Sequence, residues 1–152
     1  MSEAIPFAPP TLIKGGVSIA RPHGNLPWLP PLGTVWHVEA GTHFEAIRAG
    51  QTLGRAALTL LGDASGAVIC DPWSRIHYFL TKPSSTTGWN VRETTVCGTA
   101  TYVVVPPLGA KEMHLHWTVP PPPDRPFTPV DQLRQAFHAA AEAHYGPRTE
   151  RR

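Results

Sequence analysis

The clearest periodic pattern of apolar residues lies between residues 52 and 63. Four apolar residues recur there at the spacing i, i+4, i+7 and i+8, which is one face of a helix: Leu53, Ala57, Leu60 and Leu61. Gly62 follows them, and glycine suits the left-handed conformation that often ends a helix. Gly54 lies inside the pattern and weakens the helix by about 1 kcal/mol relative to alanine. The pattern predicts an amphipathic helix.

Residues 67–80 have the pattern of a β-hairpin. An apolar run over residues 67–70 is followed by Asp71 and Pro72, which favour a turn. In the return strand the side chains alternate between two faces. One face carries Ile76, Tyr78 and Leu80, and the other carries His77 and Phe79.

Three other segments predict strands because they are rich in β-branched and aromatic residues. They are residues 34–38, residues 94–107 and residues 113–119. Residues 43–50, in contrast, indicate a short helix or an irregular turn.

A second helix is expected between residue 129 and Gly146, where a glycine and a proline end it. Thr128 suits the N-cap and Pro129 suits the first helical position. One side of this helix carries Leu133, Phe137, Ala140, Ala141 and His144. The basic residues 148–152 then form a short tail.

Residues 1–33 are rich in proline and glycine, which disfavour both helices and central strands. This stretch predicts an extended arm that carries Trp28. The arm could dock on a partner protein, or it could be a strap that covers the domain's own surface.

The strands follow one another without regular alternation with helices, which favours an α+β fold. We expect a single domain over residues 34–147, with a mainly antiparallel sheet of four or five strands and two main helices. A length of 152 residues suits one domain with a modest core.

Charge and composition argue against several classes of protein. The net charge is +2 and the pI is near 8.7, far from the strong bias of a dedicated nucleic-acid coat protein. Neither a secretory leader nor a stretch long enough for a transmembrane helix is visible. Cys70 and Cys97 form no metal motif and no disulfide framework, so a cytoplasmic protein with reduced thiols is expected.

One candidate chemistry is metal binding. His114 and His116 are two residues apart on an expected strand, so both should point to the same side. Imidazole pairs of this kind can begin a site for one divalent ion such as zinc. A third ligand would have to come from His37, Glu39 or His77. The alternative is that these histidines lie on an edge strand and that the protein has no cofactor.

The other candidate chemistry is recognition by aromatic and basic side chains. Trp73 and Trp89 fall in turn-like segments, with Arg75 and Arg92 close by in the sequence. Such residues could stack on nucleic-acid bases or contact a partner protein. Alternatively, the tryptophans could cover a small core.

The strands resemble a known family. The segments "TVWHVEAGTHFEAIRA", "GAVICDPWSRIHYFL", "CGTATYVVVPP" and "HLHW" resemble the N-terminal domain of bifunctional DNA primase/polymerases, of the archaeo-eukaryotic primase type. They are also similar to small uncharacterised proteins of GC-rich actinobacteria. The resemblance covers residues 34–118.

The resemblance implies a degenerate active site. His37 and Glu39 fall where the family has its two metal-binding aspartates, and His77 falls near the family's motif histidine. Nucleotidyl transfer uses hard ions that prefer carboxylate oxygens, so a histidine in this pair implies lost polymerase chemistry. The implied function is a non-catalytic module that binds nucleic acid or a regulatory protein. The rival interpretations are a metal protein and an interaction module that acts through the proline-rich arm.

Overall fold

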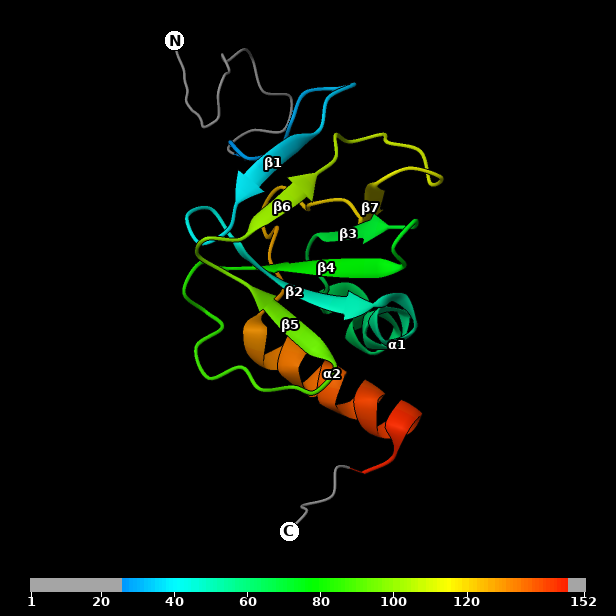
Figure 1. The fold of residues 1–152 in the computed structure, drawn as a ribbon. Helices are drawn as coiled ribbons and strands as arrows, with labels where there is room; N and C mark the ends of the chain where they lie inside the picture. Colours follow the sequence, from blue (N-terminus) through cyan, green and yellow to red (C-terminus); the bar gives the residue numbers. More distant parts are fainter. Residues whose placement is uncertain (1–25, 148–152) are drawn as a thin grey trace.

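The computed structural model describes residues 26–147, and these form an α+β fold (Figure 1). Its strands are β1 (Trp36–Glu39), β2 (Glu45–Gly50), β3 (Val68–Asp71), β4 (Ile76–Thr81), β5 (Thr94–Cys97), β6 (Tyr102–Val105) and β7 (His116–Val119). Its helices are α1 (Gln51–Leu61), the short 3₁₀ helix η1 (Gly62–Ala64) and α2 (Val130–Tyr145). Within residues 26–147, no helix is long and apolar enough to cross a membrane.

Five strands form one antiparallel sheet in the order β5-β2-β4-β3-β7. The connection from β2 through α1 to β3 skips one position, which β4 fills, so that β2, α1 and β3 form a split β-α-β unit. Strands β1 and β6 form a separate two-stranded antiparallel sheet. The expected fold class is therefore confirmed, with the small second sheet in addition.

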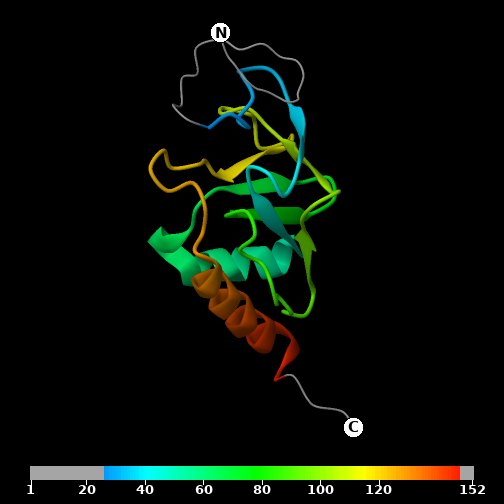
Figure 2. The same cartoon turned by 90° about the vertical axis from the view of Figure 1, so that its left-hand side faces the viewer.

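Each face of the five-stranded sheet is covered. Helices α1 and α2 lie on one face, and the small sheet lies on the other (Figures 1 and 2). On the helical side Phe79 of β4 packs edge-on against Phe137 of α2, with ring centroids 5.0 Å apart. Because both faces are buried, several strands lack the simple alternation of apolar and polar residues.

Residues 26–33 belong to the packed domain. Trp28 is 3% exposed, and its ring lies 5.3 Å from that of Phe44 and 6.2 Å from that of Trp117. Leu26 and Leu29 are buried in the same cluster. This part of the expected arm covers the domain's own core, as a strap would. The rest of the arm (residues 1–25) and the basic tail (residues 148–152) lie outside the described residues.

Two segments differ from the sequence-based expectations. Residues 45–50, expected as a helix or turn, form β2, an interior strand of the large sheet that buries Ala46 on one face and Ile47 on the other. Residues 94–107, expected as one strand, form β5 and β6 in different sheets. A turn between them includes Ala100 at a φ of 73°. Residues other than glycine rarely adopt this conformation, so the sequence does not indicate a turn here.

The ends of the helices match the expectations in part. Gly62 after α1 and Gly146 after α2 both have positive φ, at 54° and 85°. At the start of α2, however, Pro129 is the N-cap and no side chain caps the helix. Thr128 is buried instead, and its Oγ1 accepts a 2.8 Å hydrogen bond from the backbone N–H of Gly66.

Candidate functional site

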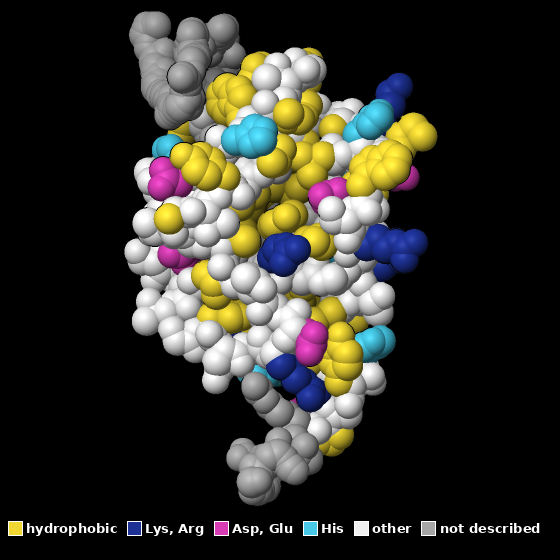
Figure 3. All heavy atoms as spheres, viewed as in Figure 1, with side chains coloured by type: hydrophobic (Ala, Val, Ile, Leu, Met, Phe, Trp, Pro, Cys, Tyr) yellow, Lys and Arg dark blue, Asp and Glu magenta, His cyan; other side chains and the backbone are white. Residues whose placement is uncertain are grey.

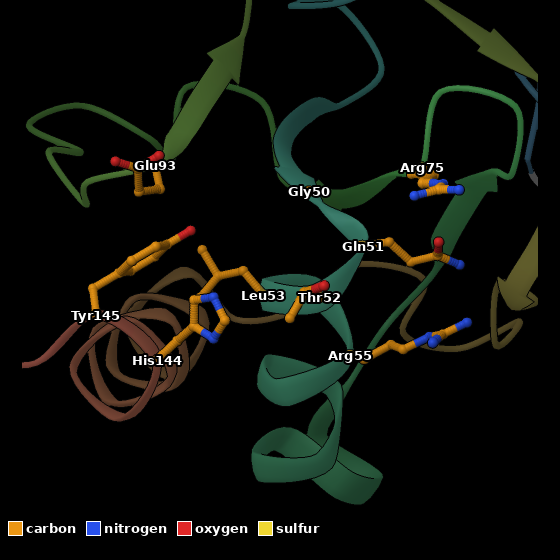
Figure 4. A pocket seen from close by; sticks show the side chains of 9 residues that line it. All are labelled: Gly50, Gln51, Thr52, Leu53, Arg55, Arg75, Glu93, His144 and Tyr145. Atoms are coloured by element: carbon orange, nitrogen blue, oxygen red, sulfur yellow. The ribbon is translucent and has the colours of Figure 1, made fainter.

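A pocket of about 550 Å³ lies where β2 ends and α1 begins. Its walls come from the start of α1, the β3–β4 turn, the residue before β5 and the end of α2 (Figure 4). The lining residues are Gly50, Gln51, Thr52, Leu53, Arg55, Arg75, Glu93, His144 and Tyr145. Segments that are far apart in the sequence therefore meet around one space.

The first side of this pocket is cationic. The side chains of Gln51, Arg55 and Arg75 extend to the same side of the start of α1 (Figure 4). Among residues 26–147, neither arginine forms an ion pair with a carboxylate. Arg75 has a φ of 60°, and its carbonyl accepts a 2.8 Å hydrogen bond from the backbone N–H of Gln51. The turn that presents Arg75 is thus tied to the first residue of the helix.

The start of α1 adds to this positive potential. Gly50 is the N-cap, no side chain caps the helix, and its first turn holds no acidic residue. The first N–H groups of a helix lack internal partners and carry a partial positive charge. Glu93 is the one carboxylate among the described lining residues.

The second side of the pocket is aromatic. Tyr145 is 49% exposed, and its ring packs edge-on against that of His144, with centroids 4.5 Å apart. The guanidinium of Arg92 lies 5.5 Å from the centre of the Tyr145 ring. It also donates hydrogen bonds to the carbonyls of Ala141 and Gly146, so it holds the end of α2 in place.

A polar row lies behind Gln51, on the sheet face that α1 covers. Cys70 of β3 pairs in register with His77 of β4 on one side and with His116 of β7 on the other. The amide Nε2 of Gln51 lies 3.9 Å from the Sγ of Cys70. Burial raises the pKa of the Cys70 thiol, and the hydrogen bond with Thr118 opposes that rise. The thiol is therefore protonated at neutral pH and is not an activated nucleophile.

His77 is the most constrained member of this row. It is 2% exposed, and its Nδ1 has no hydrogen-bond partner in the described chain. Burial lowers its pKa to about 4, with smaller contributions from the positive charges of Arg55 and His116. Its ring packs against α1 at Gly54, where an added Cβ would lie 2.3 Å from Nδ1. Gly54 weakens the helix pattern, but the His77 ring leaves no room for a larger residue at this position.

The residues expected to bind metal are spread over the fold. His37 and Glu39 are exposed on β1, in the small sheet, whereas His77 is buried in the large one. His114 precedes β7 instead of sharing the strand, and its carbonyl lies 2.7 Å from the Nδ1 of His116. Within residues 26–147, no group of three His, Cys, Asp or Glu side chains is placed to hold a metal ion.

The aromatic and basic candidates fall into two groups. Trp73 is 84% exposed on the β3–β4 turn, two residues before Arg75. Trp89 instead packs edge-on against Phe137 and donates a 2.9 Å hydrogen bond from Nε1 to Thr94. With Arg92 bonded to α2, the second pair supports the fold, and the first pair faces solvent.

Sequence reasoning identified Arg75 but missed the residues around it. The missed residues lie on two helices, and the contact between these helices could not be inferred from sequence spacing: Gln51, Arg55 and Tyr145. One signal was visible in the sequence, because Arg55 lies one turn into a helix that has no capping side chain. Chemically, the arrangement can bind an anionic group and an aromatic ring. Burial raises the pKa of both cysteine thiols, and within residues 26–147 no group of three His, Cys, Asp or Glu side chains is placed to hold a metal ion. No family model, curated protein or solved structure matches the chain.

Proposed function

We propose that the protein is a non-catalytic binding module for single-stranded nucleic acid, which it contacts through the β3–β4 turn and the start of α1. The observation that carries this proposal is Trp73, a large aromatic side chain that is 84% exposed beside Arg75. An exposed tryptophan beside arginines is suited to stack on a base while the guanidinium contacts the phosphate backbone.

The turn holds Trp73 in a defined position. The Oδ1 of Asp71 accepts hydrogen bonds from the backbone N–H groups of Trp73 (3.2 Å) and Ser74 (3.3 Å). A residue on a fixed turn loses less conformational entropy on binding than one on a free loop. Figure 3 shows both hydrophobic and basic side chains along the right-hand edge of this face of the molecule. This supports a single contact surface that combines stacking and charge.

The proposed nucleic-acid binding agrees with the resemblance to primase/polymerase domains, but the proposal assigns no nucleotidyl transfer to this protein. His37 and Glu39, which stand in place of the family's aspartate pair, are exposed on β1 and lie on a different sheet from His77. We place the protein in the cytoplasm, where free thiols persist, because Cys70 and Cys97 are both unpaired and buried. Cys97 belongs to the core cluster on one face of the sheet, whereas Cys70 lies on the opposite face, which α1 covers.

The test is the salt dependence of strand binding. A fluorescently labelled single-stranded oligonucleotide is titrated with the intact protein at several salt concentrations, and anisotropy gives the affinity. Each phosphate contact contributes a slope of about 0.7 in log affinity against log salt for a single strand. Arg75→Gln should reduce the slope by about this amount.

Arg125→Gln is the matched control, because Arg125 is exposed on the connection between β7 and α2 and does not line the pocket. It should leave the slope unchanged. Binding that is absent, independent of salt or equally affected by both substitutions removes the proposal. A partner protein retained by the same turn in the absence of nucleic acid would also replace it.

A further inference from the structure

The pocket at the start of α1 has two chemically different ends. Arg55, Arg75 and Gln51 supply donors and positive charge at one end. Tyr145, His144 and Glu93 supply an aromatic surface and a carboxylate at the other, as Figure 4 shows. The two ends lie on opposite sides of the start of α1, so a single ligand that fills the pocket must cross the first residues of the helix and match both ends (Figure 4).

The cationic end suits a dianion. Two guanidinium groups, without carboxylate partners among residues 26–147, line the pocket beside the amide of Gln51 and the hydroxyl of Thr52. A phosphate monoester carries between one and a half and two negative charges at neutral pH and offers three acceptor oxygens. Arginine binds such groups through two parallel hydrogen bonds. The donor set therefore matches a phosphate monoester better than a neutral group.

The aromatic end suits a flat ring with hydrogen-bond donors. Tyr145 is half exposed, and its ring contacts the guanidinium of Arg92 and the imidazole of His144. Glu93 is exposed nearby and makes no ion pair within the described chain, so its carboxylate is open to accept hydrogen bonds from a sugar hydroxyl or an exocyclic amine. A volume of about 550 Å³ falls within the range of small-ligand sites.

We propose that this pocket binds a nucleoside monophosphate, with the phosphate between Arg55 and Arg75 and the base against Tyr145. The ligand can be a free nucleotide or the phosphorylated end of a strand. This goes beyond the proposed function, because stacking on Trp73 needs neither Arg55 nor Tyr145.

Isothermal titration of the full chain with adenosine monophosphate, adenosine and inorganic phosphate tests the proposal. The monophosphate should bind at least tenfold more tightly than either part alone. Arg55→Gln and Tyr145→Leu should each weaken its binding by roughly tenfold, since each removes one of the two recognition elements. Arg125→Gln and Tyr102→Leu are the matched controls, because both residues are exposed and lie outside the pocket lining.

Two further measurements separate the ligand sources and the two proposals. A strand with a 5′-phosphate that binds more tightly than its 5′-hydroxyl form, with the difference lost in Arg55→Gln, identifies a strand end as the ligand. Trp73→Ala should weaken strand binding but leave monophosphate binding unchanged, so either proposal can fail alone. Bound anion should also shield His77 from Arg55 and raise the pKa of that imidazole, as followed by NMR.

Three results would overturn the pocket assignment. The first is equal binding of adenosine and its monophosphate. The second is monophosphate binding that survives Arg55→Gln and Tyr145→Leu. The third is no binding of either the monophosphate or the 5′-phosphorylated strand.

Discussion

At the scale of single residues, Gly54 of α1 packs directly against the side chain of His77 of β4. The imidazole fills the space that a Cβ at position 54 would occupy, 2.3 Å from Nδ1. Sequence reasoning recognised each residue separately, Gly54 as a weak point in a helix and His77 as a possible ligand. Their relation could not be predicted, because it depends on how α1 sits on the sheet. The same holds for the row of Cys70, His77 and His116, which only strand register brings together.

Gly54→Ala should therefore destabilise the protein although alanine favours helices. Forcing a methyl group into a packed contact costs about 1–3 kcal/mol, which exceeds the gain of about 1 kcal/mol in helix propensity. Urea denaturation measures the change in unfolding free energy. In a double-mutant cycle with His77→Ala, the alanine at position 54 should become neutral or stabilising. An equal cost in both backgrounds would show that the imidazole is not the obstacle.

The burial of His77 also predicts acid sensitivity. Its pKa is lowered to about 4 in the folded state, against 6.5 for a free histidine. Between these values the unfolded chain binds more protons, so stability rises with pH, is complete above about 6.5, and is lost as pH falls toward 4. The loss is on the order of 3 kcal/mol.

Unfolding free energies between pH 7 and 5 test this dependence before most carboxylates titrate. The slope should be smaller in His77→Gln than in the wild-type protein. Burial also lowers the pKa of His43, so His43→Gln provides the comparison for a second histidine that acts in the same direction. Identical slopes in wild type and His77→Gln would contradict the assignment.

At the scale of elements, the hairpin, α1 and α2 were predictable because each carries its own pattern of apolar residues or turn residues. Strand β2 was not, since burial on both faces removes the alternation that identifies a strand. The division of residues 94–107 into β5 and β6 was hidden by a turn with an alanine at positive φ. Of the candidate site, the β3–β4 turn with Trp73 and Arg75 was predicted, whereas the contribution of α2 required the packing of two helices.

The end of α2 depends on a side chain from another element. Arg92 donates hydrogen bonds to two carbonyls at this end and lies over the ring of Tyr145. Its positive charge is also attracted to the partial negative charge at the C-terminus of the helix. Arg92→Met should cost about 1–3 kcal/mol, since hydrogen bonds from a charged group are lost. Amide hydrogen exchange at residues 141–146 should accelerate more than exchange in β4, which should follow only the change in global stability.

Arg125→Met is the control for this change, because Arg125 is exposed on the connection that precedes α2, away from the helix end that Arg92 contacts. Unchanged exchange at the end of α2 in Arg92→Met would show that the helix end does not need the guanidinium.

At the scale of the whole molecule, the five-stranded sheet needs a cover on both faces. The helices supply one, and the small sheet with residues 26–33 supplies the other. Composition and strand order were enough to predict the class. The second layer depends on Trp28, whose proline-rich surroundings predicted an extended arm that would either dock on a partner or cover the domain's own surface. The segment keeps the irregular backbone that its prolines favour, and burial of this large aromatic side chain holds it on the domain.

Two tryptophan substitutions distinguish the core from the exposed surface. Trp28→Ala should destabilise the fold by about 3–5 kcal/mol, as expected when a buried aromatic side chain is removed. Trp73→Ala should change stability by less than about 0.5 kcal/mol, because that side chain is exposed. Thermal and urea unfolding check both. A small effect of Trp28→Ala would mean that residues 26–33 are not part of the core.

The central claim is that an exposed tryptophan on the β3–β4 turn binds single-stranded nucleic acid. The most direct measurement is the affinity of Trp73→Ala for a labelled single strand at fixed low salt, compared with that of Tyr102→Ala. Tyr102 is 62% exposed on β6, in the small sheet away from the turn. Because stacking contributes about 1–3 kcal/mol per base, Trp73→Ala should weaken binding by roughly 5- to 150-fold, and Tyr102→Ala should not weaken it. Equal affinities of the two variants and the wild-type protein would contradict the account.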